Sequence, residues 1–261
     1  LGGLIVTYAS WRLIFFINLP IAVLGMVLAT LYIPNVRDDG RSPFDWISFL
    51  LSAAGLTALT LALDGLGPRL LPVTTALSLL VLGAGLMLIL VLRLRRTRTG
   101  LLDLSLFRLP SFRSAMTGGL LSRAQNGAAP FLLVLLLQSS FGLTPLHASL
   151  IIGTSAIGAL TMRSGAPSLL RRFGFRSVLI ASTLLTSGIF LLYALCAVSG
   201  SLYGIIAVLL AGGFVRSLQF TTLNGLAYSE VGPNKLSHAT ALVATLQQMA
   251  QAFGVGVSAI M

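Results

Sequence analysis

The amino-acid sequence predicts an all-α, polytopic membrane protein, and three observations carry this prediction. Hydrophobic residues make up 56% of the 261 residues and charged residues 9%, whereas soluble domains contain about 25% charged residues. Apolar segments close to the roughly 20 residues that cross a bilayer recur along the whole chain. The period-two alternation of a transmembrane barrel is absent, and an open sheet would leave unsatisfied backbone groups in lipid. The mean hydropathy of +0.96 agrees, so the lipid bilayer is the expected surroundings.

Apolar runs set the expected helices, and short polar or Pro- and Gly-containing stretches separate them. An apolar stub over residues 1–8 is interpreted as the tail of a helix, and Pro72 stands at the permissive start of another. The chain begins without a signal-peptide pattern and stops inside an apolar run, so both ends are expected to be cut. Eight helices are expected in order over residues 13–33, 44–63, 72–92, 113–138, 146–166, 177–198, 202–228 and from 239 onward. The separating stretches are 9–12, 34–43, 64–71, 93–112, 139–145, 167–176, 199–201 and 229–238.

Positively charged residues gather on one side of the predicted bundle. Successive helices reverse direction, so the loops fall into two sets, and one set holds only Arg12 and Arg69. The positive-inside rule places the other set in the cytoplasm, which indicates a multi-pass protein of the inner membrane. This placement explains most of the net charge of +11 and removes the main argument for a nucleic-acid partner. The cytoplasmic set is Arg37, Arg41, Arg93, Arg95, Arg96, Arg98, Arg108, Arg113, Arg171, Arg172, Arg176 and Lys235.

Three parts are expected along the chain. Residues 1–33 end an N-terminal bundle, residues 34–110 hold two linker transmembrane helices and a basic cytoplasmic loop, and residues 111–261 form a C-terminal bundle of five helices, the last one truncated. The boundary lies in the longest loop, which begins with clustered arginines and ends in a short amphipathic stretch over 101–110. A solvated basic linker and a helix lying on anionic lipid both remain open for this stretch.

Motifs of enzymes and metal sites are missing. His147 and His238 have no Glu, Asp or Cys at ligand spacing, and Cys196 is the only cysteine, which excludes an intrachain disulfide. No phosphate-binding glycine loop follows a strand, and no Ser/His/Asp set has a suitable frame. We therefore expect no enzyme activity, no metal and no cofactor.

Three arginines lie inside predicted helices, where charge is costly and therefore indicates function. Arg123 follows Arg113 by about 15 Å of helix, and Arg216 lies midway along its own helix, so both are expected near the midplane. Arg163 lies about 25 Å from the outer end of its helix, where its stem can reach the cytoplasmic headgroups. For Arg123 and Arg216 the alternative is a buried structural cation bonded to helix carbonyls.

Polar residues share one face on each of three predicted helices, those over 113–138, 202–228 and from 239 onward. Their coincidence in one block of the chain predicts a shared aqueous cavity that holds a small-molecule substrate. For the amide side chains the alternative is interhelical hydrogen bonding that only holds the bundle together. The predicted cavity-lining residues are Arg123, Asn126, Arg216, Gln219, Asn224, Gln247 and Gln251.

Acidic residues are absent from the centres of the predicted helices. Only 6 occur in the chain, and Asp64 and Glu230 lie at helix ends, where loop or capping roles are expected. A proton-coupled transporter usually needs a midmembrane carboxylate, and this chain does not contain one.

Five stretches of sequence stand in a particular order: LGG at 1–3, SWRLIFFINLP at 10–20, GAAPFLL at 127–133, LRRFGFR at 170–176 and RSLQFTTLN at 216–224. In this order they resemble the fourteen-helix drug:proton antiporters of the major facilitator superfamily. By the resemblance, the chain runs from the end of the fifth helix to the thirteenth. The residues that carry the resemblance are Gly2, Gly3, Trp11, Arg12, Asn18, Pro20, Pro130, Arg172, Gly174 and Arg176.

The resemblance implies proton-coupled export of drugs by two rocking bundles, with the proton as coupling ion and with a missing N-terminal half as partner. The pattern departs from the family in places. Only Gly2 and Gly3 remain of the antiporter motif, and Pro167 and Arg171 stand where the cytoplasmic loop motif has glycine and aspartate. Since coupling in this family is attributed largely to the missing half, the chain alone is not expected to transport.

Two other functions stay open. One is export of an endogenous metabolite, with an anion as a candidate, since the central helices offer arginines and no carboxylate. The other is a non-transporting membrane scaffold or sensor derived from a transporter.

Overall fold

The computed structural model describes residues 12–32, 45–66, 71–96 and 103–260, and within these ranges the chain forms helices and no strand. The all-α prediction is confirmed. The expected stub over 1–8, with Gly2 and Gly3, lies outside the described residues, as does Trp11. The elements are α2 (Leu13–Tyr32), α3 (Trp46–Leu66), α4 (Val73–Arg96), η1 (Leu104–Arg108), α5 (Pro110–Phe141), α6 (Pro145–Ser199), α7 (Leu202–Tyr228), η2 (Pro233–Lys235) and α8 (Leu236–Ile260).

Membrane-length apolar helices dominate the described part of the chain. By length and composition, 5 of the described helices can cross a bilayer: α3, α4, α5, α6 and α7. The 55-residue helix α6 counts as one of these 5. In α2 the apolar segment Phe16–Tyr32 is shorter. Arg12 directly precedes α2, and Asn18 and Pro20 lie within it.

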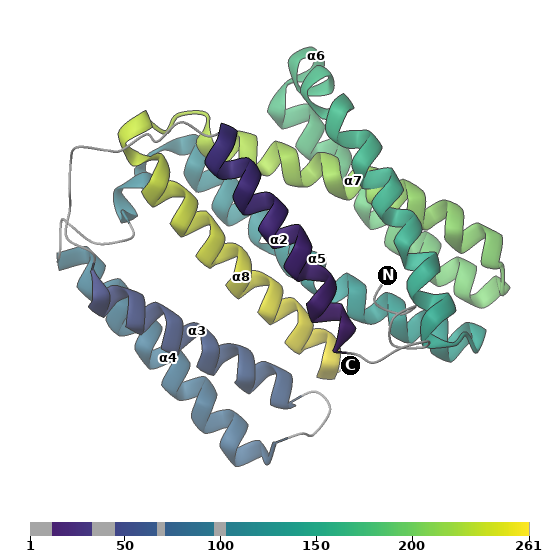
Figure 1. The fold of residues 1–261 in the computed structure, drawn as a ribbon, viewed down its shortest axis with the longest axis horizontal. Helices are drawn as coiled ribbons and strands as arrows, with labels where there is room; N and C mark the ends of the chain where they lie inside the picture. Colours follow the sequence, from purple (N-terminus) through teal and green to yellow (C-terminus); the bar gives the residue numbers. More distant parts are fainter. Residues whose placement is uncertain (1–11, 33–44, 67–70, 97–102, 261) are drawn as a thin grey trace.

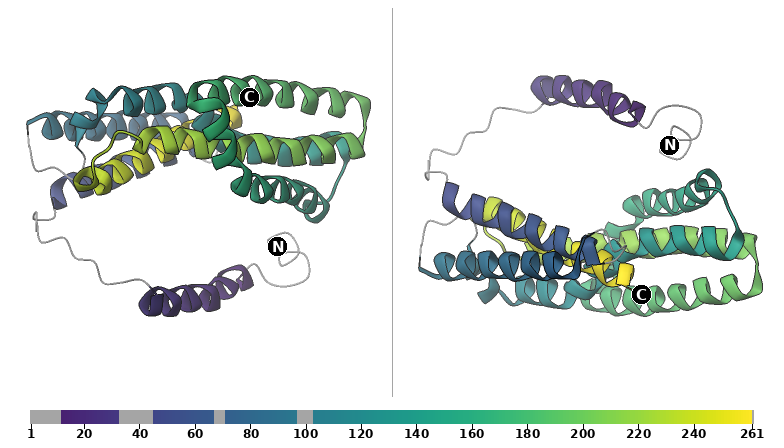
Figure 2. Two further views of the ribbon diagram at one scale, coloured as in Figure 1. Left: turned by 90° about the horizontal axis from the view of Figure 1, so that it is seen from above. Right: turned by 90° about the horizontal axis from the view of Figure 1, so that it is seen from below.

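The described helices form a bundle, a hairpin that packs against the bundle, and one separate helix. α5, α7, α8 and the two limbs of α6 lie together, and the α3–α4 hairpin lies beside α8 (Figure 1). α2 lies apart from these helices (Figure 2), and its side chains are exposed, with Phe16 at 66% and Leu31 at 72%. An apolar helix with this much exposed surface requires lipid or other helices around it.

α6 differs from the prediction of two helices separated by a loop over 167–176. Helical structure runs through Pro167, and the chain reverses at one residue, Gly174, whose φ is 73° and ψ 163° (Figure 1). The prediction ended the helix before Pro167 because proline removes a backbone donor. In membrane helices a proline is tolerated, because neighbouring groups satisfy the freed carbonyl. The prediction of a separating loop here was therefore wrong.

Gly174→Ala is expected to destabilise the bend of α6 by about 1–3 kcal/mol, since this backbone region is open essentially to glycine only. A Cβ at this position would meet no atom within 4 Å, so the cost comes from the backbone and not from a clash. The thermal unfolding temperature of the purified full-length protein measures the effect. Gly188→Ala, also in α6 with nothing within 4 Å of its added Cβ, is the matched control. Equal unfolding temperatures for the two variants would contradict this account.

Two helix pairs approach closely through reciprocal glycines. A Cβ added at Gly127 of α5 would overlap the Gln251 backbone of α8, and one added at Gly254 of α8 would overlap the carbonyl of Ala124. In the same way Gly158 of α6 and Gly213 of α7 each lie against the other helix's backbone. Small residues at such crossings let helices pack without side chains between them, which is the main source of attraction in lipid.

The amphipathic stretch before α5 is packed into the protein. Residues 104–108 form the 3₁₀ helix η1, and Leu106, which is 1% exposed, packs in a core with Leu90, Phe112 and Leu242. The Phe107 ring meets Phe112 edge-on at 5.5 Å. Neither open alternative, a solvated linker or a helix on lipid, describes these residues, because their apolar side chains find partners on α4, α5 and α8. The division of the chain at residue 110 stays a prediction.

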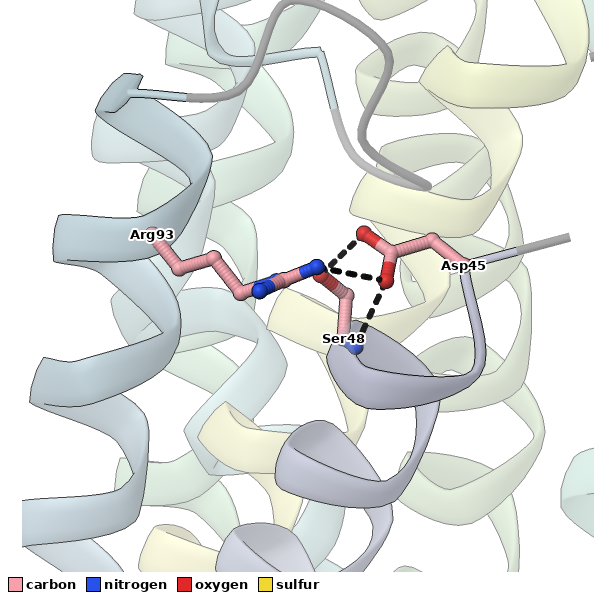
Figure 3. Close-up of polar contacts among 3 residues, drawn as sticks. All are labelled: Asp45, Ser48 and Arg93. Atoms are coloured by element: carbon pink, nitrogen blue, oxygen red, sulfur yellow. Dashed lines mark hydrogen bonds and ion pairs between the residues drawn. The ribbon is translucent and has the colours of Figure 1, made fainter. Parts of the chain in front are cut away.

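Carboxylates cap and join helix ends. Asp45 precedes α3 and accepts hydrogen bonds from the backbone nitrogen of Ser48 at 3.1 Å and from its hydroxyl (Figure 3). Arg93 of α4 lies 3.3 Å from the same carboxylate and closes the α3–α4 hairpin. The hydrogen bonds from Ser48 are the main reason that the pKa of Asp45 lies below its usual value.

Two further contacts tie η1 and the start of α5 to the segment after α7. Glu230 accepts hydrogen bonds from the Ser111 backbone nitrogen at 3.2 Å and hydroxyl at 2.7 Å. A carboxylate is favoured there because the first N–H groups of a helix lack partners. Lys235 lies 2.8 Å from Asp103 and donates to the Ser105 hydroxyl at 2.9 Å. As the sequence predicts, Glu230 acts at a helix end.

The Asp103 contact is expected to weaken in acid. Burial raises the pKa of Asp103, but hydrogen bonds from Lys235 and Ser105 outweigh it and lower the pKa to about 2. Because the folded-state pKa is depressed, the stabilisation is present above about pH 4 and is lost as the pH falls towards about 2. Wild type should therefore exceed Asp103→Asn in unfolding free energy by up to about 1 kcal/mol at neutral pH. The difference should shrink in acid, and a difference independent of pH would contradict this assignment.

Candidate functional site

Two hollows adjoin inside the bundle of α5 to α8. The first, here called the enclosed cavity because it is the less open of the two, measures about 130 Å³ and lies between α5, both limbs of α6 and α7. Its lining residues are Gln125, Asn126, Ala129, Pro130, Leu133, Ile152, Ser155, Thr186, Ile189, Phe190, Tyr193, Leu209, Gly212, Gly213, Arg216 and Gln219.

The second hollow, here called the open groove, measures about 530 Å³ and adds α8 to its walls. Its lining residues are Asn126, Ala159, Arg163, Arg216, Ser217, Phe220, Thr221 and Gln251. On α5 the enclosed cavity extends from Asn126 towards the helix end at Phe141, whereas on α7 the groove extends from Arg216 towards Tyr228. With the predicted topology, the cavity lies towards the outer side and the groove towards the cytoplasm.

Asn126 and Arg216 line both hollows and therefore form the wall between them. Arg216 comes from the middle of α7 and Asn126 from the middle of α5. Gly213, one turn before Arg216, lies against the backbone of Ser155 and brings this part of α7 close to α6. The close crossing therefore positions the arginine at the boundary of the two hollows.

Arg216 is half-buried and makes no hydrogen bond or ion pair with any residue in the described part of the chain. No carboxylate lines either hollow in that part. The guanidinium carries N–H donors in a fixed fork, which suits the oxygen atoms of a bound solute.

Gln219 is a hydrogen-bonding centre between three helices. Its side-chain nitrogen donates to the hydroxyl of Ser122 at 3.0 Å and of Thr183 at 3.1 Å, and its oxygen accepts from Thr186 at 3.5 Å. The side chain is 4% exposed and borders the enclosed cavity. Its hydrogen bonds join α7 to α5 and α6, as the interhelical alternative expects, while the side chain also borders the cavity.

Arg123 lies outside both hollows. It is 2% exposed, its Nη2 is 3.5 Å from Asn224 Oδ1 and its Nη1 is 3.6 Å from Met116 Sδ, while Nε has no partner. The Asn224 contact joins α5 to α7, whereas Met116 lies on α5 itself. The structure thus places Arg123 away from the predicted cavity position, as a buried cation whose contacts are the Asn224 amide oxygen and the Met116 sulfur and not the helix carbonyls of the alternative.

Of the other predicted residues, one lines the open groove and the others line neither hollow. Gln251 lines the open groove together with Arg163, whose side chain is exposed. Asn224 accepts the Arg123 contact, and neither Asn224 nor Gln247 lines the enclosed cavity or the open groove. The structure therefore brings Asn126, Arg216, Gln219 and Gln251 around the two hollows.

Aromatic residues of the enclosed cavity were not predicted from the sequence. Phe190 and Tyr193, three residues apart on the second limb of α6, meet edge-on with ring centroids 5.7 Å apart. Their spacing places them on one helix face, but the same spacing is common in lipid-facing helices. Pro130, which belongs to the family-like stretch at 127–133, lines the same cavity.

The family-like residues near the bend of α6 lie elsewhere. Arg172 and Arg176 are exposed on either side of Gly174, away from both hollows. Within the described residues no three His, Cys, Asp or Glu side chains gather as a metal site would require.

Membrane-length helices around two adjoining hollows define a multi-pass helical membrane protein. The sequence matches the Major Facilitator Superfamily over residues 1–255. The chain therefore belongs to this superfamily, a family of membrane transporters.

Curated relatives agree with this membership. The chain is 35% identical over 262 residues to the "Putative multidrug resistance protein MdtD" of Escherichia coli K12, with 100% of this chain and 55% of that protein covered. The protein of the same name from Serratia proteamaculans is 33% identical over 261 residues, with 100% and 54% covered. The chain thus spans about half the length of the curated relatives it matches.

Proposed function

We propose that the full-length protein is a secondary active transporter that exports drugs or other lipophilic small molecules in exchange for protons, by alternating access. The observation that carries the proposal is the wall formed by Asn126 and Arg216 between two adjoining hollows. The names of the relatives, multidrug resistance proteins, support the substrate class.

A wall between two hollows suits a solute site that faces one side of the membrane at a time. A solute held at Arg216 would lie within reach of both the enclosed cavity and the open groove. The glycine crossings make the pairs α5–α8 and α6–α7 close-packed units, which favours their movement as rigid bodies and not by bending. In this proposal, the described structure is one of the conformations between which the two helix pairs move.

The lining of the enclosed cavity suits a lipophilic solute. Most of its walls are apolar or aromatic, including Phe190, Tyr193 and Leu209, and a few amide and hydroxyl groups lie among them. A mostly apolar pocket with few polar groups is typical of sites for small organic molecules.

Proton coupling usually uses a carboxylate, which the described lining of the two hollows lacks. Their described lining contains arginine, amide and hydroxyl groups and no carboxylate. We therefore assign the coupling carboxylate to the part of the full-length protein that corresponds to the other half of its relatives.

The test is transport by inverted membrane vesicles that contain the full-length protein. Addition of a lipophilic fluorescent cation with an imposed pH gradient should give accumulation above vesicles without the protein, and collapse of the gradient should abolish it. Accumulation that survives the loss of the gradient would reject proton exchange, and no accumulation of any lipophilic compound would reject drug export.

Export of an endogenous organic anion is the second candidate, and the unpartnered Arg216 beside Arg163 favours it. Two guanidinium groups, with no carboxylate in the described lining of the groove, attract an anionic solute. The same vesicles with a panel of lipophilic cations and aromatic carboxylates separate the candidates. Preference for the carboxylates selects the anion exporter, and preference for the cations selects the drug exporter.

A further inference from the structure

The bend of α6 encloses an apolar groove, distinct from the two hollows described above. It measures about 290 Å³, and a hydroxyl at its base, that of Ser182, donates to its own helix at Leu179. All but two of the lining side chains are apolar. They are Leu169, Phe173, Ser177, Val178, Ala181, Ser182, Leu185 and Leu218.

The groove extends along α6 over a distance close to the hydrocarbon thickness of one bilayer leaflet. From Ser177 to Leu185 the second limb of α6 rises about 12 Å, and the hydrocarbon of one leaflet is about 15 Å thick, half of about 30 Å. Leu184 and Leu185 are 68% and 55% exposed along this stretch, so the groove opens to the surroundings of the bundle and not to its interior. For a membrane helix those surroundings are lipid tails.

Two arginines, here called the rim, are sequence neighbours of groove residues without lining the groove themselves. The guanidinium carbon of Arg172 lies 5.4 Å from the centroid of the Phe173 ring, which is itself a groove wall. Arg176 directly precedes Ser177 at the mouth, and both arginines are exposed. Neither forms an ion pair with a carboxylate in the described part of the chain. The rim therefore presents uncompensated positive charge where the apolar wall ends.

We propose that the groove at the α6 bend binds one anionic phospholipid, with an acyl chain against Phe173, Ala181 and Leu185 and the phosphate at Arg172 and Arg176. Basic residues at the cytoplasmic surface attract anionic headgroups, and an adjoining apolar groove selects a lipid over a soluble phosphate because it buries a chain. Ser177, which lines the groove and follows Arg176, supplies a hydroxyl that would donate to a lipid ester or phosphate oxygen. This site does not depend on the proposed transport function.

The test measures lipid retention by the purified full-length protein in native mass spectrometry. Phosphatidylglycerol should bind more tightly than phosphatidylethanolamine with the same acyl chains, and glycerol phosphate should not bind measurably. Arg172→Ala combined with Arg176→Ala should weaken phosphatidylglycerol binding about twenty-five-fold, at about five-fold for each arginine. The matched control, Arg108→Ala with Arg113→Ala, removes the same charge from exposed residues away from the groove and should change little.

A second variant tests the chain-binding wall without altering charge. Ala181→Phe fills the groove and should weaken phosphatidylglycerol binding, whereas Ala194→Phe, further along the same limb and also exposed, should not. Equal binding of the two phospholipids, equal losses in the two arginine pairs, tight binding of glycerol phosphate, or no effect of Ala181→Phe would each overturn the proposal. Arg172→Lys with Arg176→Lys, which keeps the charge, should retain most of the binding.

Discussion

Arg216→Ala in the full-length protein is expected to reduce the rate of export roughly 10- to 100-fold. A hydrogen bond to a charged group contributes about 1.5–3 kcal/mol, and Arg216 is the one residue of the wall between the hollows that carries a charge. Its donors are not used by the described part of the protein, so the variant removes contacts to solute without breaking contacts of the fold. Initial rates in inverted vesicles, divided by the amount of folded transporter, measure the effect.

Two other arginines are controls with different expectations. Arg113→Ala, at an exposed position of α5, should leave both export and protein amount unchanged. Arg123→Ala should instead lower the amount of folded protein, because Arg123 is buried against Asn224 and Met116. Arg216→Lys should be intermediate, since lysine keeps the charge but loses the planar fork of donors. Normal expression of Arg216→Ala with unchanged export would reject the proposed site.

Gly254→Ala is expected to destabilise the bundle by about 1–3 kcal/mol or more, as overpacking does in well-packed interiors. The added Cβ would overlap the carbonyl oxygen of Ala124, a backbone atom that cannot move aside without separating α5 from α8. The reciprocal contact of Gly127 with Gln251 would be opened by the same movement. Because Gln251 lines the open groove, export should fall together with stability.

The matched control for this substitution is Gly118→Ala in α5, where a Cβ meets nothing within 4 Å. There alanine should be neutral or stabilising by up to about 1 kcal/mol, because it is the better helix former. Unfolding temperatures of the two purified variants, measured in the same detergent, compare the two positions directly. If Gly254→Ala is as stable as Gly118→Ala, the close crossing of α5 and α8 is not as described.

The positions of the helices were largely predictable from the sequence, because a helix that crosses lipid must be apolar along one continuous segment of the chain. The predicted range 202–228 coincides with α7, and the ranges 13–33 and 113–138 differ from α2 and α5 by a few residues at their ends. The exception is the reversal of α6. Pro167 indicated an end of the helix by its local chemistry, yet the turn occurs at Gly174, where the backbone adopts a conformation that glycine alone tolerates.

The sequence did not distinguish polar residues that border a hollow from polar residues that are buried between helices. Arg123 and Arg216 have the same signature, an arginine near the middle of an apolar helix beside glycines. The fold buries Arg123 between α5 and α7 and leaves Arg216 at the wall of two hollows. Gln219 and Gln251 likewise share a pattern, but Gln219 is satisfied by Ser122 and Thr183 on other helices while Gln251 faces the groove. In both pairs the two residues differ because their helix faces pack against different neighbouring helices.

The sequence by itself determined the membrane class, the order of helices and the family resemblance that the superfamily match then confirmed. These properties depend on residues close together in the chain, since hydropathy and helix length act within one segment. Only the tertiary structure decided which arginine borders a hollow and where two backbones touch. The contact of Gly254 with Ala124, or of Lys235 with Asp103, joins residues more than a hundred positions apart. No local pattern specifies such pairs, because they follow from how separate helices pack against one another.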